Sequence, residues 1–501
     1  MQLMRRIFSS PIAALAAGAC LRFFFFLHYP GGAGDTALYE GLATNWFKFH
    51  TYGITVDGVL TPVDTRMPGY PLFLAIIYWI SGKSGPDARP AIMVTQVIVD
   101  LLTCLVIGAV AATLSSLASD KLATRRSFVA AVWLAALCPF TSNYVAVVLT
   151  ETLATFFTAL AVLFLCLLLA RLRSSTPVAG SANLLARLNA SWCALLIGLA
   201  AGLGTLFRPE TPLLLVVACA VLAWHLARSH DWLRMVRIFA LMVAGCILPL
   251  APWAIRNAVT LHEVQFLAPK NATLPSELVP YGFMAWEKTW LFRLKDCYQV
   301  AWKLNDEAIQ LEDIPARAFD TPEEKERVAA ILEKYNEDTT FTDEEDTSFG
   351  ELAKERTARH PLRTYLWIPL ARATTIWLSP RIELLPFSGK VFPLGEAWEE
   401  DPVDQSVTIF FVILNIFYLA LGGWGPWKLW RYPGARIAVA LLSGYIIVRT
   451  AFLATLETPE PRYVLVCFPI LLALAAQSFH PRNAREDQLG APSETGIEPA
   501  T

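Results

Sequence analysis

The sequence predicts an all-α polytopic membrane protein with about 10–12 transmembrane helices. Three observations predict it. First, 55% of the 501 residues are hydrophobic and only 17% are charged, too few polar side chains to cover a soluble fold of this size. Second, apolar stretches of about 20 residues recur, as a hydrocarbon core about 30 Å thick requires. Third, Lys and Arg collect in every second connection between these stretches.

Ten apolar stretches are candidate membrane spans. In chain order they cover residues 7–27, 92–115, 127–147, 152–172, 189–207, 211–228, 235–255, 405–423, 437–456 and 463–479. Two further apolar segments disturb this pattern. Residues 70–82 are too short to span, and residues 364–386 are interrupted by Pro369 and Pro380. We therefore expect both to be interfacial or re-entrant helices.

The positively charged connections should face the cytoplasm, which fixes the orientation of the chain in the cytoplasmic (inner) membrane. Both termini then lie inside, and the tail at 481–501 is expected to be disordered. The long segments 28–91 and 256–404 lie outside. The expected organisation is an N-terminal transmembrane module at 1–255, an outer domain at 256–404 and C-terminal spans at 405–480.

The outer segment 256–404 contains 27 of the 43 acidic residues of the chain, so it should form a water-exposed, mainly helical domain. One helix should begin at Thr321, where a capping Thr is followed by Pro322 and two glutamates. A second helix should begin at Thr342 and end before Pro361.

Charged residues near a membrane are costly, so each merits a functional hypothesis. The predicted topology places the strongest candidates at the outer surface. They are, in chain order, Asp35, Asp64, Arg66, Glu151, Arg208, Glu210, Arg256, Glu460 and Arg462. Arg22 and Arg449 lie inside spans but near their outer ends, from which they can extend toward the same layer. The active site is therefore expected in this layer.

These residue types suit the transfer of a sugar from a polyprenyl phosphate to a hydroxyl group. A carboxylate can take the proton of the acceptor hydroxyl, and Asp35 is the expected general base. Arginines hold a phosphate through paired, charge-assisted hydrogen bonds. In-line attack on an oxocarbenium-like centre would invert the anomeric configuration. The short apolar segment 70–82 would help to form a groove for the lipid tail.

Plainer interpretations stay open for several of these residues. They are helix capping for Asp35 and Glu151, membrane anchoring for Arg66, and structural ion pairs for Arg208 with Glu210 and for Arg462 with Glu460. Asp100, inside a span, is expected to be a buried hydrogen-bonding group. The nine cysteines lack metal-ligand spacing. No cofactor is assigned: the converging acids leave room for a divalent metal ion, whereas arginines alone can hold a monophosphate donor.

Several short motifs make the chain resemble the integral-membrane glycosyltransferases of the C superfamily (GT-C), in particular the protein-mannosyltransferase and aminoarabinose-transferase group. The motifs are Gly34-Asp35 with Tyr39 and Ala43, Arg66-Met67-Pro68-Gly69-Tyr70-Pro71, Gln96, Leu149-Thr150-Glu151, Phe207-Arg208-Pro209-Glu210, Pro252-Trp253-Ala254-Ile255-Arg256-Asn257 and Glu460-Pro461-Arg462-Tyr463. The resemblance implies a GT-C-type helix bundle. It also implies a catalytic acid at Asp35, a second acid at Glu151 and contact between Arg66 and the lipid phosphate.

The resemblance further implies that a polyprenyl-phosphate-linked sugar is transferred outside the cytoplasmic membrane. The protein-mannosyltransferase branch carries an Asp-Glu pair in its first loop, whereas Asp35 is followed by Thr36, so protein O-mannosylation is disfavoured. The outer segment 256–404 matches no part of the family and would be expected to shape acceptor choice.

We therefore predict a glycosyltransferase with a lipid-phosphate sugar donor and a hydroxyl acceptor on a lipid, glycan or protein. Membrane lipid is a further partner, and nucleic acid is not. Asp35 and Glu151 are the predicted catalytic residues, and the predicted substrate-binding residues are Tyr39, Asp64, Arg66, Arg208, Glu210, Arg256 and Arg462. Two alternatives stay open: a multi-pass transporter or flippase of lipids or sugars, and a non-catalytic envelope-assembly protein. The sequence shows no internal repeat and its charges collect at one face, which disfavours a transporter.

Overall fold

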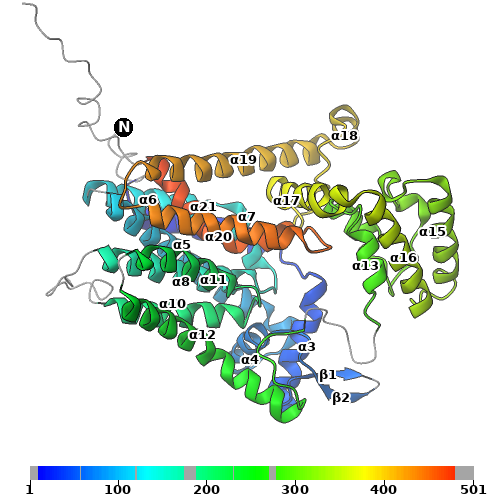
Figure 1. Cartoon of the computed structure of the whole chain (residues 1–501), viewed down its shortest axis with the longest axis horizontal. Helices are drawn as coiled ribbons and strands as arrows, with labels where there is room; N and C mark the ends of the chain where they lie inside the picture. Colours follow the sequence, from blue (N-terminus) through cyan, green and yellow to red (C-terminus); the bar gives the residue numbers. More distant parts are fainter. Residues whose placement is uncertain are drawn as a thin grey trace, which may run out of the picture.

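The protein is a bundle of long helices with a smaller helical domain beyond one end of it (Figure 1). The computed structural model describes residues 9–56, 58–118, 121–173, 188–228, 231–269 and 278–479. This architecture confirms the predicted all-α membrane protein. The tail that is expected to be disordered, 481–501, lies outside the described residues.

Seven helices within the described ranges are long and apolar enough to cross a membrane. They are α2 (Pro11–His28), α5 (Arg89–Ala118), α8 (Glu151–Arg173), α12 (Trp232–Thr260), α19 (Pro402–Trp430), α20 (Arg436–Ala454) and the last helical stretch, made of η7 (Pro461–Cys467), α21 (Phe468–Ala475) and η8 (Ala476–Phe479). An eighth span results if α6 (Lys121–Ala136) is joined to α7 (Pro139–Ser142) and η2 (Asn143–Ala146), from which it is bent by 53°. The bend coincides with Pro139, because proline interrupts a continuous helix.

Two predicted spans form helices that are short for a bilayer. α10 (Ala190–Thr205) and α11 (Leu213–Ala227) have 16 and 15 residues. Helices of this length measure about 24 and 22 Å, below a hydrocarbon thickness of about 30 Å. Each of the ten predicted spans is mostly helical within the described residues. By length and composition, however, seven or eight qualify, fewer than the expected number.

The two short apolar segments are also helical. α4 (Gly69–Ser81) has 13 residues and is too short to span, as expected. The second segment is shorter than the predicted 364–386. It consists of η6 (Arg363–Trp367) and α17 (Ile368–Leu378), and irregular chain follows. The helix stops there because the residue before Pro380 is biased away from helical geometry.

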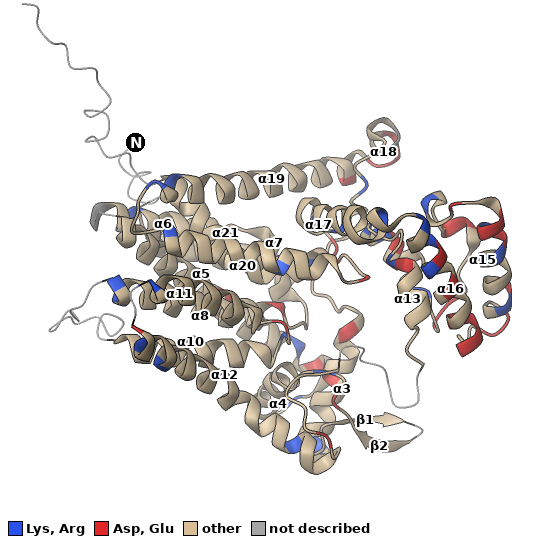
Figure 2. Ribbon diagram, in the orientation of Figure 1, with Lys and Arg blue, Asp and Glu red and all other residues tan. Residues whose placement is uncertain are grey.

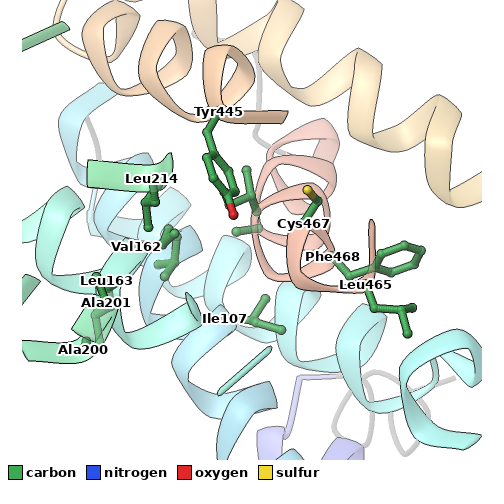
Figure 3. Close-up of a cluster of buried hydrophobic side chains, with 14 of the residues drawn as sticks. Ile107, Val162, Leu163, Ala200, Ala201, Leu214, Tyr445, Leu465, Cys467 and Phe468 are labelled. Atoms are coloured by element: carbon green, nitrogen blue, oxygen red, sulfur yellow. The ribbon is translucent and has the colours of Figure 1, made fainter. Parts of the chain in front are cut away.

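The helices of the bundle share one hydrophobic core. Figure 3 shows side chains such as Ile107 of α5, Val162 of α8 and Tyr445 of α20 turned toward one another. α10 and α12 are in direct contact at Gly198, where a Cβ atom would lie 2.0 Å from the carbonyl oxygen of Met242. Small residues at such crossings let membrane helices approach closely.

Arg22 does not extend to the outer surface as expected. Its side chain is fully buried, and its Nε donates a hydrogen bond to Asp100 over 2.7 Å. Its Nη1 donates to the carbonyl of Ala136 over 2.8 Å. The carboxylate and carbonyls satisfy the guanidinium inside the bundle, so it has no need to reach water. Asp100 is the buried hydrogen-bonding group that the sequence predicts.

The described chain between α12 and α19 is mainly helical, as predicted. Its helices are α13 (Tyr281–Glu287), α14 (Leu294–Gln299), η3 (Ala301–Lys303), η4 (Leu311–Asp313), η5 (Ala316–Ala318), α15 (Pro322–Tyr335), α16 (Asp343–Arg359), η6, α17 and α18 (Leu394–Glu400). Part of this segment has a core of its own, which includes Phe283, Trp286, Trp290 and Phe349. Figure 2 shows acidic and basic residues along α15 and α16, two helices that also contribute Val328 and Phe349 to this core.

The two predicted helix starts of the outer domain are confirmed. The hydroxyl of Thr321 accepts the N–H of Glu324 over 3.2 Å at the start of α15. The hydroxyl of Thr342 accepts the N–H of Glu345 over 3.4 Å, and the Glu345 carboxylate accepts the N–H of Thr342 in return. α16 ends at Arg359, before Pro361.

The chain between α2 and α5, which is predicted to lie outside, contains a small β-hairpin that is not among the elements predicted from the sequence. This segment runs through α3 (Gly34–Phe49), β1 (Gly53–Val56), β2 (Val59–Pro62), α4 and η1 (Gly85–Ala88). The strands are antiparallel and pair Gly53 with Pro62 and Val56 with Val59. The hairpin separates α3 from the segment that carries Arg66.

Glu287 is a buried carboxyl group at the junction between the outer domain and the bundle. Its side chain is 3% exposed, and its Oε1 has no hydrogen-bond partner among the described residues. Across the junction, Lys288 forms an ion pair with Glu457 over 2.6 Å, and Arg372 donates to the Leu291 carbonyl over 2.8 Å. Burial raises the pKa of Glu287 to about 8, the charge of Glu457 adds to the rise, and Arg372 opposes it.

We expect Glu287 to make the protein less stable at higher pH. Its pKa in the fold exceeds the unfolded value of about 4.3, so the native state holds a proton that the unfolded chain releases. The resulting stability is present below pH about 4.3 and is lost as pH rises toward about 8. The unfolding temperature of the purified protein should fall less across this pH range for Glu287→Gln than for the parent. An identical pH dependence in both would contradict this expectation.

Candidate active site

Asp35 is positioned by contacts between the start of α3 and the irregular chain before α8. The N–H of Gly31 donates to the Ala146 carbonyl over 3.0 Å. The hydroxyl of Thr36 donates to the Val148 carbonyl over 3.1 Å and accepts the N–H of Ala33. These bonds join two segments that are more than a hundred residues apart in the chain. They bring the first turn of α3 beside the first turn of α8.

Gly69 positions the segment that carries Arg66. Its N–H donates to the Leu206 carbonyl over 2.8 Å, and a Cβ atom at this position would lie 2.5 Å from that oxygen. Only glycine permits this approach. The start of α4 therefore lies against the turn between α10 and α11, and Arg66 is brought near Arg208.

Gln96 of α5 fixes the backbone below the site. Its amide nitrogen donates to the carbonyls of Val145 and Val147 over 3.0 and 2.9 Å. Its amide oxygen accepts the hydroxyl of Tyr70 over 2.9 Å. Because Gln96 is fully buried, these bonds satisfy polar backbone that helix geometry leaves unpaired before α8.

Eight charged side chains meet where these segments converge, and we call them the charged cluster. They are Asp35, Arg66, Glu151, Arg208, Glu210, Arg449, Glu460 and Arg462. Their ion pairs connect them without a break: Asp35 with Arg66 (2.9 Å) and Arg462 (3.3 Å), Arg462 with Glu151 (3.9 Å) and Glu460, Arg208 with Glu151 and Glu210 (3.8 Å), and Glu210 with Arg449 (2.8 Å). Figure 2 shows acidic and basic segments gathered near α3. Four carboxylates match four arginines, so the cluster has no net charge.

Exposure divides the charged cluster into an accessible edge and an enclosed part. The side chains of Asp35 and Arg66 are each 27% exposed, and that of Arg462 is 18% exposed. Glu151 is 3% exposed and Arg449 only 1%. A ligand that arrives from outside would meet the accessible edge first. The burial of Glu151 favours a role in positioning arginines over direct contact with a substrate.

Asp35 is held in its ionised form. Burial alone would raise its pKa, but the charges of Arg66 and Arg462 outweigh burial, and the pKa is lowered. The pKa of Arg66 is raised, because its attraction to Asp35 exceeds the effect of burial. Burial and the nearby Asp35 charge raise the pKa of Tyr39 to about 12, so its phenol stays protonated at neutral pH.

Asp35 and Glu151 do not act as helix caps. α3 begins at Gly34, Ala33 occupies the cap position, and the side chain of Asp35 points to arginines instead. α8 begins at Glu151, whose carboxylate pairs with Arg208. Both acids still lie in first turns, where the positive end of the helix dipole favours a negative charge. The capping interpretation is therefore wrong for both residues.

Arg256 and Asp64 lie outside the charged cluster. Arg256 donates to the carbonyls of Tyr52 and Val63 over 2.6 and 2.9 Å, on either side of the hairpin. Its guanidinium lies over the rings of Tyr52 and Trp253. Asp64 contributes charge near Arg256 but makes no ion pair in the described structure. Arg256 therefore fastens the hairpin to α12, and its predicted contact with the donor phosphate stays a prediction.

Two side chains, the acidic Glu460 and the aromatic Tyr463, complete the site without being among the predicted substrate-binding residues. Glu460 pairs with Arg462 and accepts the phenol of Tyr463, and the ring of Tyr463 lies 5.2 Å from the Arg208 guanidinium. Arg449 reaches the cluster from α20, as its predicted extension toward the outer layer requires. The motif that contains Glu460 is visible in the sequence, but the approach of Tyr463 to Arg208 of another element is not.

A metal site is not evident in the part of the chain that the structure describes. No group of three or more His, Cys, Asp or Glu residues there is arranged to hold an ion. Within the charged cluster, each carboxylate faces at least one arginine. The described donor set therefore fits an anionic ligand better than a divalent cation.

No protein-family description and no curated protein matches the sequence. Solved structures do match. The archaeal oligosaccharyltransferase AglB from Archaeoglobus fulgidus, in complex with an inhibitory peptide and a dolichol-phosphate, matches 93% of this chain with 14% identity and a TM-score of 0.45. ArnT from Cupriavidus metallidurans, bound to undecaprenyl phosphate, matches 94% of this chain with 13% identity and a TM-score of 0.36. The chain covers 50% of AglB and 77% of ArnT, so it spans about half the length of the oligosaccharyltransferase. Both matches extend over most of this chain, at low identity.

Proposed function

We propose that the protein transfers a sugar from a polyprenyl-phosphate donor to an acceptor hydroxyl at the outer face of the cytoplasmic membrane. The observation that carries this proposal is the accessible edge of the charged cluster. There, one carboxylate, Asp35, lies between two arginines, Arg66 and Arg462. The donor phosphate needs cations to hold it, and the acceptor hydroxyl that displaces it needs a carboxylate to take its proton. Both kinds of group must therefore lie side by side.

In the proposed reaction, Arg66 and Arg462 hold the oxygens of the donor phosphate. The acceptor oxygen attacks the anomeric carbon from the opposite side, which inverts its configuration. The bond from the anomeric carbon to the phosphate oxygen breaks, and its electron pair leaves with the polyprenyl phosphate. Asp35 takes the proton of the acceptor hydroxyl. Arg208, placed by Glu151 and Glu210, adds positive charge behind the departing phosphate.

The orientation of the chain can be tested with single cysteines. Glu337 is exposed in the outer domain, and Arg431 is exposed at the predicted cytoplasmic end of α19. We expect Glu337→Cys to react with an impermeant thiol reagent on intact cells, above the labelling of the parent chain. Arg431→Cys should react only after the cells are opened. The reverse pattern would contradict the proposed outer location of the site.

A transporter or flippase is the main alternative, and the fate of the donor distinguishes it. Purified protein in liposomes would be given a polyprenyl-phosphate sugar and an envelope extract as the source of acceptors. A transferase releases free polyprenyl phosphate, whereas a transporter leaves the donor intact. We expect release with the parent chain and none with Arg66→Ala. An intact donor with the parent chain, under conditions where the donor is bound, would contradict the transferase proposal.

A further inference from the structure

Asp35 is not free to act as a base in the structure as it stands. Its Oδ1 accepts a hydrogen bond from Arg66 over 2.9 Å, and its Oδ2 accepts one from Arg462 over 3.3 Å. Both carboxylate oxygens are therefore occupied by cations that also lower its affinity for a proton. A base in this state is poorly prepared to take a proton from an acceptor hydroxyl.

The two arginines that hold Asp35 are also the accessible ones. Among the described residues, the Arg66 side chain hydrogen-bonds only to Asp35 and to the carbonyl of its neighbour Thr65, at 3.0 Å. Arg462 stays anchored by Glu460 and Glu151 when it loses Asp35. The same two guanidinium groups can thus hold either the Asp35 carboxylate or an incoming phosphate.

We propose that the phosphate of the donor displaces Asp35 from Arg66 and Arg462, so that donor binding itself releases the general base. This inference rests on the proposed function and adds an order of events to it. The charge balance supports it. The cluster pairs four carboxylates with four arginines, so a bound phosphate makes it net negative. Excess negative charge next to Asp35 favours its protonated form and so strengthens it as a base. Asp35 therefore becomes an effective base when the donor is in place.

The proposal predicts that removing the Asp35 carboxylate tightens phosphate binding while it strongly slows transfer. Undecaprenyl phosphate would be titrated into the purified full-length protein in nanodiscs. We expect its Kd to fall on the order of tenfold for Asp35→Asn and for Asp35→Ala, because the phosphate no longer competes with a carboxylate. In an Arg66→Ala background, the same Asp35→Asn change should lower the Kd much less, because one of the two arginines for which carboxylate and phosphate compete is absent.

Glu40→Gln is the matched control. Glu40 lies on the same helix, α3, and pairs with Arg89 over 2.8 Å, outside the charged cluster. Its substitution removes one carboxylate from an arginine pair without touching Asp35, so the Kd should not change. Inorganic phosphate, titrated separately, tests whether the lipid tail contributes. It should bind far more weakly than undecaprenyl phosphate in every variant.

The outcomes separate the inference from the proposed function. If the parent chain and all variants fail to bind undecaprenyl phosphate, the proposed function is wrong. If the parent binds and Asp35→Asn and Asp35→Ala bind equally or more weakly, the displacement is wrong and the proposed function stands. If Asp35→Asn lowers the Kd as much in the Arg66→Ala background as in the parent chain, the displacement is also wrong. Equal affinity for inorganic phosphate would show that the arginines bind free phosphate instead of a lipid-linked one.

Discussion

Asp35→Asn is expected to lower the rate of sugar transfer by about 10²–10⁴-fold, the usual contribution of a positioned general base. The amide keeps the shape of the side chain but cannot accept the proton of the acceptor hydroxyl. Transfer would be measured as modified acceptor formed per unit of protein in isolated membranes. Folding should be largely retained, because the Asp35 side chain lies at the accessible edge of the cluster, 27% exposed.

Glu40→Gln serves as control for this prediction as well, because it alters α3 without altering the charged cluster. Its transfer rate should match that of the parent chain. An Asp35→Asn protein that keeps more than about a tenth of the parent rate would remove the general-base assignment. The site would then need another proton acceptor, for which Glu210 is the next most exposed carboxylate of the cluster, with a side chain 15% exposed.

Arg462→Ala is expected to combine a large loss of activity with a loss of stability. Arg462 pairs with Asp35, Glu151 and Glu460 at once, and its removal leaves three neighbouring carboxylates without a shared cation. Removing one member of a largely buried ion-pair network typically costs about 3 kcal/mol or more. We therefore expect a lower unfolding temperature and at least about a hundredfold slower transfer, since an electrostatic contact to the departing phosphate is lost.

Arg462→Lys separates the two effects. Lysine restores one positive charge but not the planar fork that contacts several oxygens at once. Stability should recover in part, while transfer stays well below that of the parent chain. Thermal scans and transfer assays on the same preparations would report both quantities. Full activity in Arg462→Lys would show that charge alone suffices, and full activity in Arg462→Ala would place the phosphate elsewhere.

Much of the bundle can be predicted from the sequence, because length and hydropathy alone limit what can cross a membrane. The outer helix starts at Thr321 and Thr342 are likewise local, since a capping side chain acts on the turn that follows it. The hairpin in the first outer loop has a local signal too, Asp57-Gly58 between β-branched residues. The sequence interpretation places only interfacial helices in that loop and so misses the hairpin.

Local sequence patterns do not predict which charged residues of the site form ion pairs. Asp35 and Arg462 are 427 positions apart, and they meet only because the bundle brings α3 and η7 together. Topology predicts that the charged residues share one face, but not which of them touch. Arg256 is an example. Its motif suggested phosphate binding, but its guanidinium donates hydrogen bonds to two backbone carbonyls beside the hairpin. Glu151 is buried against Arg208, with which it forms an ion pair. The sequence pattern does not show that the turn carrying Arg208 lies this close to Glu151.

The central claim is that Asp35 acts on a polyprenyl-phosphate-linked sugar, and the amount of that donor in cells tests it most directly. Polyprenyl-phosphate sugars would be quantified by mass spectrometry in cells that lack the chain and in cells that express the parent, Asp35→Asn or Glu40→Gln at equal levels. We predict that the donor accumulates without the chain and with Asp35→Asn, and that Glu40→Gln restores the low level of the parent. A low donor level in Asp35→Asn cells, equal to that of the parent, would contradict the claim.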